Sequence, residues 1–430
     1  MRTERHTIDS GPVSGRDDLS SQRGFTLVET LVGLAITAEV LLVALLLFDV
    51  NSRLARNQVQ VADMQQSQRI AHNDLVRLVR MAGRGGLRQD VAVVVQDDVD
   101  PSADAINGNP PIEGSDILTV RGVLNSPMYQ INQAAAKYTP PSGSNQTGQI
   151  LIGSVTPTGI EQKLDVFDQV TASSQFGQAE TDALMLVSAT SDSIYAVVEI
   201  TNISFSDVDL NGDGTTDREA TISFTASLSG NSNDLSVRLG ALNSTPGVFP
   251  AALTQTGSVG FAGVVEEYRF YTRNDTTALG GYAPKLSRAR FYPNTARIYG
   301  EEANSSTTGV ANGRIDIAEN VLDLQVALGM DLDANGMIDD EDDRADDEWL
   351  FNDPDDDLSD FAGNPPLFNL ALMTLVRTDR IDRGYQSEPL AELANHVYNE
   401  SSIPTTPQQR VDRSYRRQLL TTMVDLRNVN

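Results

Sequence analysis

The longest apolar run of the chain, residues 25–48, comes directly after 24 polar and charged residues. A helix of this length spans roughly 36 Å at about 1.5 Å per residue, which is enough to cross a lipid bilayer. Apolar side chains then recur every three to four residues as far as Met81, and a glycine-rich segment, residues 83–86, follows. The pattern predicts one long helix over residues 25–82, with its first half in a membrane and its second half packed on a folded head.

From about residue 90, runs rich in Val, Ile, Phe and Tyr alternate with polar stretches, which is typical of β-strands. The predicted strands are residues 117–123, 183–189, 193–205, 220–228, 264–272 and 367–377. Long polar stretches, notably residues 125–180 and 229–256, lie between them. The expected fold class is α+β: a long N-terminal helix packed on an antiparallel β-sheet head, residues 83–430, with long loop insertions. A separate second domain within the head remains an alternative.

Charge and cysteine content exclude several functions. The chain has 32 Lys and Arg against 59 Asp and Glu, a net charge of −27, and no Cys. Because sequence-independent binding to nucleic acid needs a basic face, no direct nucleic-acid partner is expected. The lack of Cys excludes disulfides, thiolate catalysis and Cys-ligated zinc.

Glu29 lies five residues into the apolar run. An ionised carboxylate there costs several kcal/mol unless it is paired, so it is a functional candidate by default. If the chain were cut after Gly24, Phe25 would carry a free amine one helical turn from Glu29. That amine could pair with the Glu of a neighbouring subunit. The simpler alternative is a signal anchor that tolerates a carboxylate near the interface.

Residues 23–30, Arg-Gly-Phe-Thr-Leu-Val-Glu-Thr, resemble the type IV prepilin motif. In that family a prepilin peptidase cuts after the Gly and methylates the new N-terminal Phe, and the Glu at the fifth mature position guides subunit docking. The resemblance implies a leader over residues 1–24, processing at Gly24 and Phe25, and an assembly role for Glu29. Unlike many major pilins, the apolar run contains no Pro.

Two further segments, residues 114–121 and 413–428, resemble parts of the PilW-type minor pilins, the second of them their closing strand. The resemblance implies a pilin-like head and other major and minor pilins as partners. It also implies a single pass through the lipid of the inner membrane, a periplasmic head, and a place on the pilus or cell surface after assembly.

One acidic loop has the spacing of an EF-hand-like calcium loop. Side-chain oxygens fall at loop positions 1, 3, 5, 9 and 12, a Gly stands at position 6, and position 7 offers a backbone carbonyl. The side-chain donors are Asp331, Asp333, Asn335, Asp339 and Asp342. The glycine is Gly336, and the backbone carbonyl is that of Met337. The alternative is a solvated acidic turn.

A second loop has the same spacing over positions 1 to 9, with Asp209, Asn211, Asp213, Thr215 and Asp217. Its position 12 is Ala220, so water or Glu219 would have to complete the ligand shell. Structural Ca²⁺ is therefore the expected cofactor, and it would hold long loops in place as a disulfide does elsewhere. The two acidic segments, residues 331–360 and 207–219, carry net charges of −14 and −4.

No enzyme motif stands out after residue 24. His72 and His396 are the only histidines there, and neither has a nucleophile-elbow or metal-type neighbourhood. The sequence thus favours a non-enzymatic minor pilin that takes part in type IV pilus assembly, as a priming or a tip subunit. A minor pseudopilin of a type II secretion system and a pilus-associated surface adhesin are the alternatives.

Overall fold

The computed structural model describes residues 26–87, 92–102, 106, 110–131, 137–142, 146–156, 158–168, 184–188, 195–226, 249–276, 282–293, 298, 314–332, 335, 337–338, 348–353, 356, 367–382, 384–398, 400 and 403–426. It divides into two compact units, Met1–Val59 and Gln60–Asn430.

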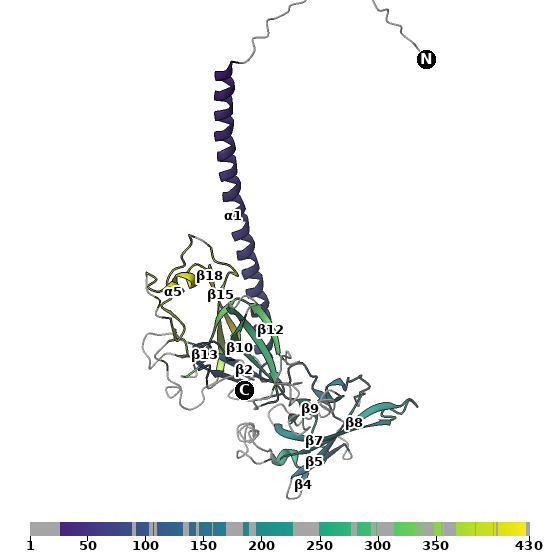
Figure 1. Cartoon of the computed structure of the whole chain (residues 1–430). Helices are drawn as coiled ribbons and strands as arrows, with labels where there is room; N and C mark the ends of the chain where they lie inside the picture. Colours follow the sequence, from purple (N-terminus) through teal and green to yellow (C-terminus); the bar gives the residue numbers. More distant parts are fainter. Residues whose placement is uncertain are drawn as a thin grey trace, which may run out of the picture. The chain divides into compact units, whose positions relative to one another are not determined.

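The predicted long helix is present as α1, Leu27–Val79, which runs through the boundary between the two units (Figure 1). It begins two residues later and ends three residues earlier than the apolar pattern predicts. After Val79 the chain makes a series of turns in which Gly83, Gly85 and Gly86 have positive φ angles. Glycine adopts this conformation without steric cost, which explains why the helix stops here.

The last part of α1 packs on the head. Its buried residues follow the predicted spacing: Met64, Gln68, Ala71, His72, Leu75, Leu78 and Val79. The apolar ones belong to a core that they share mainly with strands of two antiparallel sheets, and to which Tyr195 and Val197 of a third sheet also contribute. This packing of an amphipathic helix on a sheet is the main source of helix stability in globular proteins.

The first of these sheets has five strands in the order β1-β2-β10-β11-β12. Their bounds are β1 Val93–Gln96, β2 Ile117–Gly122, β10 Glu266–Thr276, β11 Tyr282–Phe291 and β12 Arg314–Glu319. The second has the order β14-β13-β15-β18, with β13 Val321–Met330, β14 Trp349–Leu350, β15 Leu367–Arg377 and β18 Arg417–Asp425. The strand β18 falls within the segment that resembles a closing strand.

A third sheet has seven strands in the order β3-β9-β6-β7-β8-β5-β4. Their bounds are β3 Tyr129–Gln130, β4 Tyr138–Ser142, β5 Thr147–Gly153, β6 Leu184–Ser188, β7 Tyr195–Val208, β8 Asp217–Thr225 and β9 Phe261–Val264. This sheet carries a second hydrophobic core of its own, centred on residues such as Tyr138, Ile150 and Phe224. Figure 1 labels several strands of this sheet, among them β4, β5, β7 and β8.

The remaining elements are short. They are the two-stranded hairpin β16 Glu392–Leu393 and β17 His396–Val397, the 3-10 turn η2 Ala251–Leu253, and α5 Pro407–Asp412. Thr406 caps α5 in a capping box with Gln409.

The α+β class with a long N-terminal helix and antiparallel sheets is confirmed. All six predicted strands are present, as β2, β6, β7, β8, β10 and β15. The polar stretch 125–180, however, is not a plain loop insertion, because it contributes β3, β4 and β5 to the seven-stranded sheet. Every strand pairing among the described residues is antiparallel.

Candidate functional site

The predicted processing residues, Gly24 and Phe25, lie outside the described residues. Glu29 is described and lies in the first turn of α1. Its Oε2 accepts hydrogen bonds from Thr26 N at 2.9 Å and Thr26 Oγ1 at 3.0 Å, and Glu29 N donates to Thr26 Oγ1 at 3.2 Å. These reciprocal bonds form a capping box, in which side chains satisfy backbone donors that the first helical turn leaves unpaired. The cap is not predicted above, although a Thr three residues before a Glu is its usual signal.

The first half of α1 exposes apolar side chains in every direction. The large ones between Leu27 and Val50 are all more than half exposed, from 53% for Val32 to 77% for Leu27. A helix that is apolar all round needs an apolar surrounding, and this one is long and apolar enough to cross a membrane. Within it, Thr37 satisfies its hydroxyl internally by donating to Gly33 O at 2.7 Å.

The loop at residues 209–216 joins β7 to β8 and brings its candidate ligands together. Asp209 accepts hydrogen bonds from Gly212 N at 2.7 Å and Gly214 N at 3.1 Å, and both glycines have positive φ angles. Asp213 accepts from Thr215 N at 2.7 Å, and the hydrogen bond from the Thr215 side chain lowers the pKa of Asp213. The aspartate side chains therefore fix the turns of this loop by accepting from its backbone N–H groups.

The end of this loop differs from a complete calcium loop. Ala220, at position 12, is fully buried in β8, where it pairs with Phe205 and Ile152. Glu219 is the predicted substitute for the ligand at position 12, but its carboxylate forms an ion pair with Lys137 instead. Asp217 closes the loop instead, and accepts from Leu210 N at 3.1 Å. Among the described residues, no three His, Asp or Glu side chains lie close enough together to hold a metal ion.

The other loop follows β13, and Asp333, Gly336, Asp339 and Asp342 lie outside the described residues. Its described part has the same local pattern. Asp331, which is 3% exposed, accepts from Asn335 N at 3.0 Å, and Asn335 accepts from Met337 N at 2.7 Å. Whether this loop binds calcium stays a prediction.

Residues 114–121 link the five-stranded sheet, through β2, to the four-stranded sheet, through β13. Asp116 is fully buried, and it accepts from Val326 N on β13 at 2.7 Å and from Asp98 N at 3.3 Å. Burial, together with the charge of Asp97, raises the pKa of Asp116 well above its usual range. Gly114 has φ +77°, and a Cβ at this position would lie 2.5 Å from two ring atoms of His396. Only glycine fits here.

Residues 19–45 match the sequence profile of the prokaryotic N-terminal methylation motif. The match covers the end of the polar N-terminal segment and the first part of the apolar helix. A type IV-like pilin from Thermus thermophilus is similar in structure, with 9% sequence identity, a TM-score of 0.19, and coverage of 62% of this chain and 99% of that chain. None of the curated proteins matches the sequence.

His396 belongs to a cluster that the sequence does not reveal, because its members lie far apart along the chain. Asp323, which is 1% exposed, accepts hydrogen bonds from His396 Nδ1 at 3.0 Å, from Tyr398 OH, and from Gln325 Nε2 at 3.0 Å. The His396 and Tyr398 rings stack with centroids 4.4 Å apart. These contacts tie the β16–β17 hairpin to β13.

Stability should depend on pH through His396. Burial opposes its charge, but the hydrogen bond and the charge of Asp323 outweigh burial, with Asp98 and Asp97 adding to the effect, so the pKa of His396 is raised. The stabilisation is fully present below the unfolded pKa of about 6.5 and is lost as pH rises through the folded pKa, with a slope of at most about 1.4 kcal/mol per pH unit. Denaturant unfolding across this range should show the slope in the native chain and in His72→Gln, but not in His396→Gln. An unchanged slope in His396→Gln would contradict the assignment.

The pKa of His72 is shifted in the opposite direction to that of His396. It is 5% exposed, and its Nε2 lies 2.7 Å from Thr374 Oγ1 on β15. Burial lowers the pKa of His72. Its neutral form therefore favours the folded state, and stability from this residue falls when pH drops below about 6.5.

Proposed function

We propose that this chain is a minor pilin, similar to the PilW type, that takes part in type IV pilus assembly after a prepilin peptidase cuts between Gly24 and Phe25. The observation that carries the proposal is the match of residues 19–45 to the N-terminal methylation motif, directly joined to an exposed apolar helix. The length of 430 residues supports a minor subunit, since it is large for a protein repeated along a fibre.

In this proposal α1 anchors the chain in the lipid of the inner membrane, with the head in the periplasm, and other major and minor pilins cover its apolar side chains on assembly. Transfer from lipid to a filament keeps these side chains away from water, so assembly needs no refolding of the helix. The role is structural rather than catalytic, and the net charge of −27 disfavours a direct grip on nucleic acid.

A minor pseudopilin of a type II secretion system has the same architecture and is the second candidate. Deleting the gene separates the two roles. We expect loss of surface pili, counted by electron microscopy, with normal export of secreted enzymes, and restoration of pili by the native gene. Normal piliation with blocked export would contradict the pilus proposal and favour secretion. Intact pili with lost adhesion would favour the adhesin alternative.

We also propose structural Ca²⁺ in the two acidic loops. The donor set supports it: alternate oxygens with a Gly at position 6 suit a hard cation that takes six to eight oxygen ligands. In the 209–217 loop the ligands would be Asp209, Asn211, Asp213, the Thr215 carbonyl and Asp217. In the other loop, Asp331 would begin the shell and Asp342 would complete it.

Calcium should raise the melting temperature of the full chain purified in detergent, because a ligand selective for the native state stabilises by about 2.7 kcal/mol at one hundred times its Kd. Asp209→Asn and Asp331→Asn should each lose part of the rise. Asp207→Asn, an exposed residue just outside the first loop, is the matched control and should keep all of it. No rise in the native chain, or an equal rise in all variants, would contradict the calcium proposal.

A further inference from the structure

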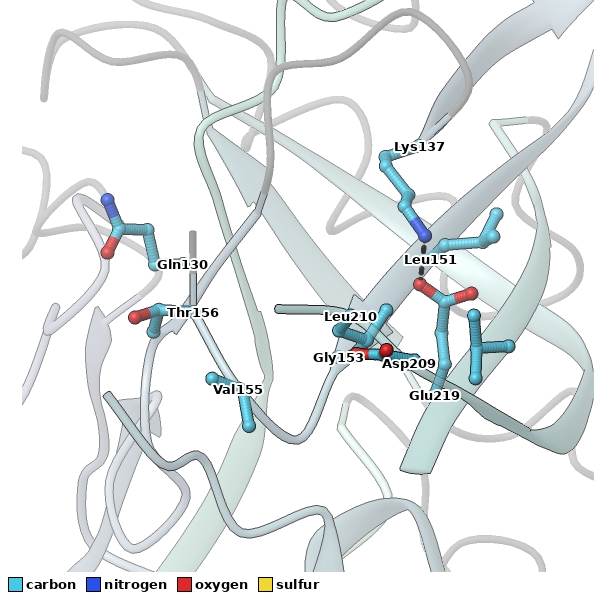
Figure 2. A pocket seen from close by; sticks show the side chains of 10 residues that line it. Gln130, Lys137, Leu151, Gly153, Val155, Thr156, Asp209, Leu210 and Glu219 are labelled. Atoms are coloured by element: carbon cyan, nitrogen blue, oxygen red, sulfur yellow. Dashed lines mark hydrogen bonds and ion pairs between the residues drawn. The ribbon is translucent and has the colours of Figure 1, made fainter. Parts of the chain in front are cut away.

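A cavity of about 270 Å³ lies in the seven-stranded sheet beside the β7–β8 loop (Figure 2). Its polar lining comes from five residues of separate segments: Gln130, Lys137, Thr156, Asp209 and Glu219. Pockets for drug-sized ligands are roughly 300–1,000 Å³, so this one suits a smaller molecule. Asp209 is also a proposed calcium ligand, but the remaining polar lining residues have no part in the functions proposed for the chain.

A partly buried ion pair lines the cavity. Lys137 Nζ donates to a Glu219 carboxylate oxygen, and the two side chains are 22% and 6% exposed. The sheet fixes both positions. Glu219 on β8 pairs with Gly153 on β5, and Lys137 O accepts a hydrogen bond from Leu151 N at 2.9 Å. Figure 2 shows the two charged groups pointing toward each other past Leu151. Burying such a pair costs desolvation energy that an apolar pair would not, so it is a poor choice for stability alone.

The choice of Lys at this position is also unusual for this protein. Lys137 is one of only three lysines, and every other basic residue is Arg. A Lys ammonium has three N–H donors that rotate about a single bond, whereas the Arg guanidinium has a fixed fork suited to carboxylates. One N–H of the Lys137 ammonium bonds to Glu219, and its other two N–H groups point in different directions because the ammonium is tetrahedral.

Leucine side chains also line the cavity. Leu151 is half-buried on β5 and faces away from the core residues Ile150 and Ile152 on the same strand. Leu210 lies directly over Gly153, where a Cβ would be 2.5 Å from Leu210 Cδ1. The cavity thus combines a charged pair and polar groups with a small aliphatic surface.

We propose that this cavity binds a neutral sugar of about monosaccharide size. A charged ligand would have to compete with one member of the Lys137–Glu219 pair for its partner. A hydroxyl both donates and accepts hydrogen bonds, so vicinal hydroxyls can bond to the ammonium and the carboxylate while the pair stays intact. The C–H face of a sugar ring then contacts Leu151 and Leu210. None of the residues that line the cavity belongs to the core that packs on α1, and the proposal does not depend on the assembly role.

The test measures the melting temperature of the full chain in detergent with D-glucose, D-galactose, D-mannose, L-rhamnose or N-acetyl-D-glucosamine. Sugars at high concentration stabilise any protein by exclusion from its surface. The informative quantity is therefore the difference between the native chain and Leu151→Phe, in which the larger ring fills the cavity. Thr147→Phe places the same ring at an exposed position of β5 and is the matched control.

We expect at least one sugar to raise the melting temperature of the native chain and of Thr147→Phe by about 3 °C more than that of Leu151→Phe. If Leu151→Phe does not fold, Gln130→Ala, which trims a half-buried lining residue, should show a reduced rise. Equal rises in the native chain and the folded lining variant with every sugar would overturn the proposal. A selective rise with glycine or succinate but with no sugar would overturn it as well, because the ligand would then be charged.

Discussion

Gly24→Leu should leave the whole population of the protein uncleaved, with residues 1–24 still attached. The resemblance of residues 23–30 to prepilins predicts a peptidase cut after Gly24, where a bulky side chain should block it, and residues 19–45 match the methylation motif. The intact mass of the protein purified from membranes would then exceed that of the mature native protein by the mass of the leader. Because an uncleaved leader prevents transfer into a filament, surface pili should be lost as well.

Gly33→Leu provides the matched control for this substitution. Gly33 lies in α1, nine residues after Gly24 in the sequence, and a Cβ there would meet nothing within 4 Å in the described structure. The same change of side chain at that position should leave cleavage complete. Complete cleavage in Gly24→Leu, or blocked cleavage in both variants, would contradict processing at Gly24.

Glu29→Ala should be cleaved normally but should abolish or strongly reduce piliation. The capping box shows that Glu29 also has a local role, because its carboxylate accepts from Thr26 N and Thr26 Oγ1. Loss of a cap costs about 0.5–2 kcal/mol, which is small for a 53-residue helix held in lipid. The assembly role should therefore dominate the effect, which is measured by counting surface pili.

Glu29→Gln separates the two roles of this residue. Gln at the same position of a capping box keeps the cap, but it has no charge to pair with the Phe25 amine of a neighbouring subunit. The assembly role predicts that Glu29→Gln loses pili as Glu29→Ala does. Glu39→Gln, a neutralised carboxylate in the same helix but outside the motif, should have a smaller effect. Normal piliation in Glu29→Gln would show that Glu29 is only a cap.

The helix and the fold class could be predicted because their signals are local. A long apolar run and a spacing of three to four residues identify α1, and the glycines of residues 83–86 mark its end. Strands rich in apolar residues, such as β7 and β15, could be predicted from the same kind of local signal.

The strands that the pattern did not predict have features that only the tertiary structure explains. Pro140 and Pro141 argue against a strand, but β4 lies at the edge of its sheet, where a missing N–H need not break a ladder bond. In β13, Asp323 and Gln325 interrupt an apolar run, yet both are buried because His396, Tyr398 and the Gly114 carbonyl pair with them.

The candidate sites also differ in whether their residues are contiguous in the sequence. The prepilin motif and the acidic loops are contiguous in sequence, so their spacing alone identifies them. The Lys137–Glu219 pair joins residues 82 positions apart, and the Asp323–His396 contact joins residues 73 apart. No local pattern encodes such pairs, because register between distant strands brings them together.

The N-terminal residue of the mature protein shows whether the chain is processed as a type IV pilin-like subunit. The protein is purified from membranes of the organism that encodes it, and its N-terminal peptide is analysed by mass spectrometry. We expect a chain that begins at N-methylated Phe25. A chain that retains residues 1–24, or one that begins at another residue, would rule out processing of this kind.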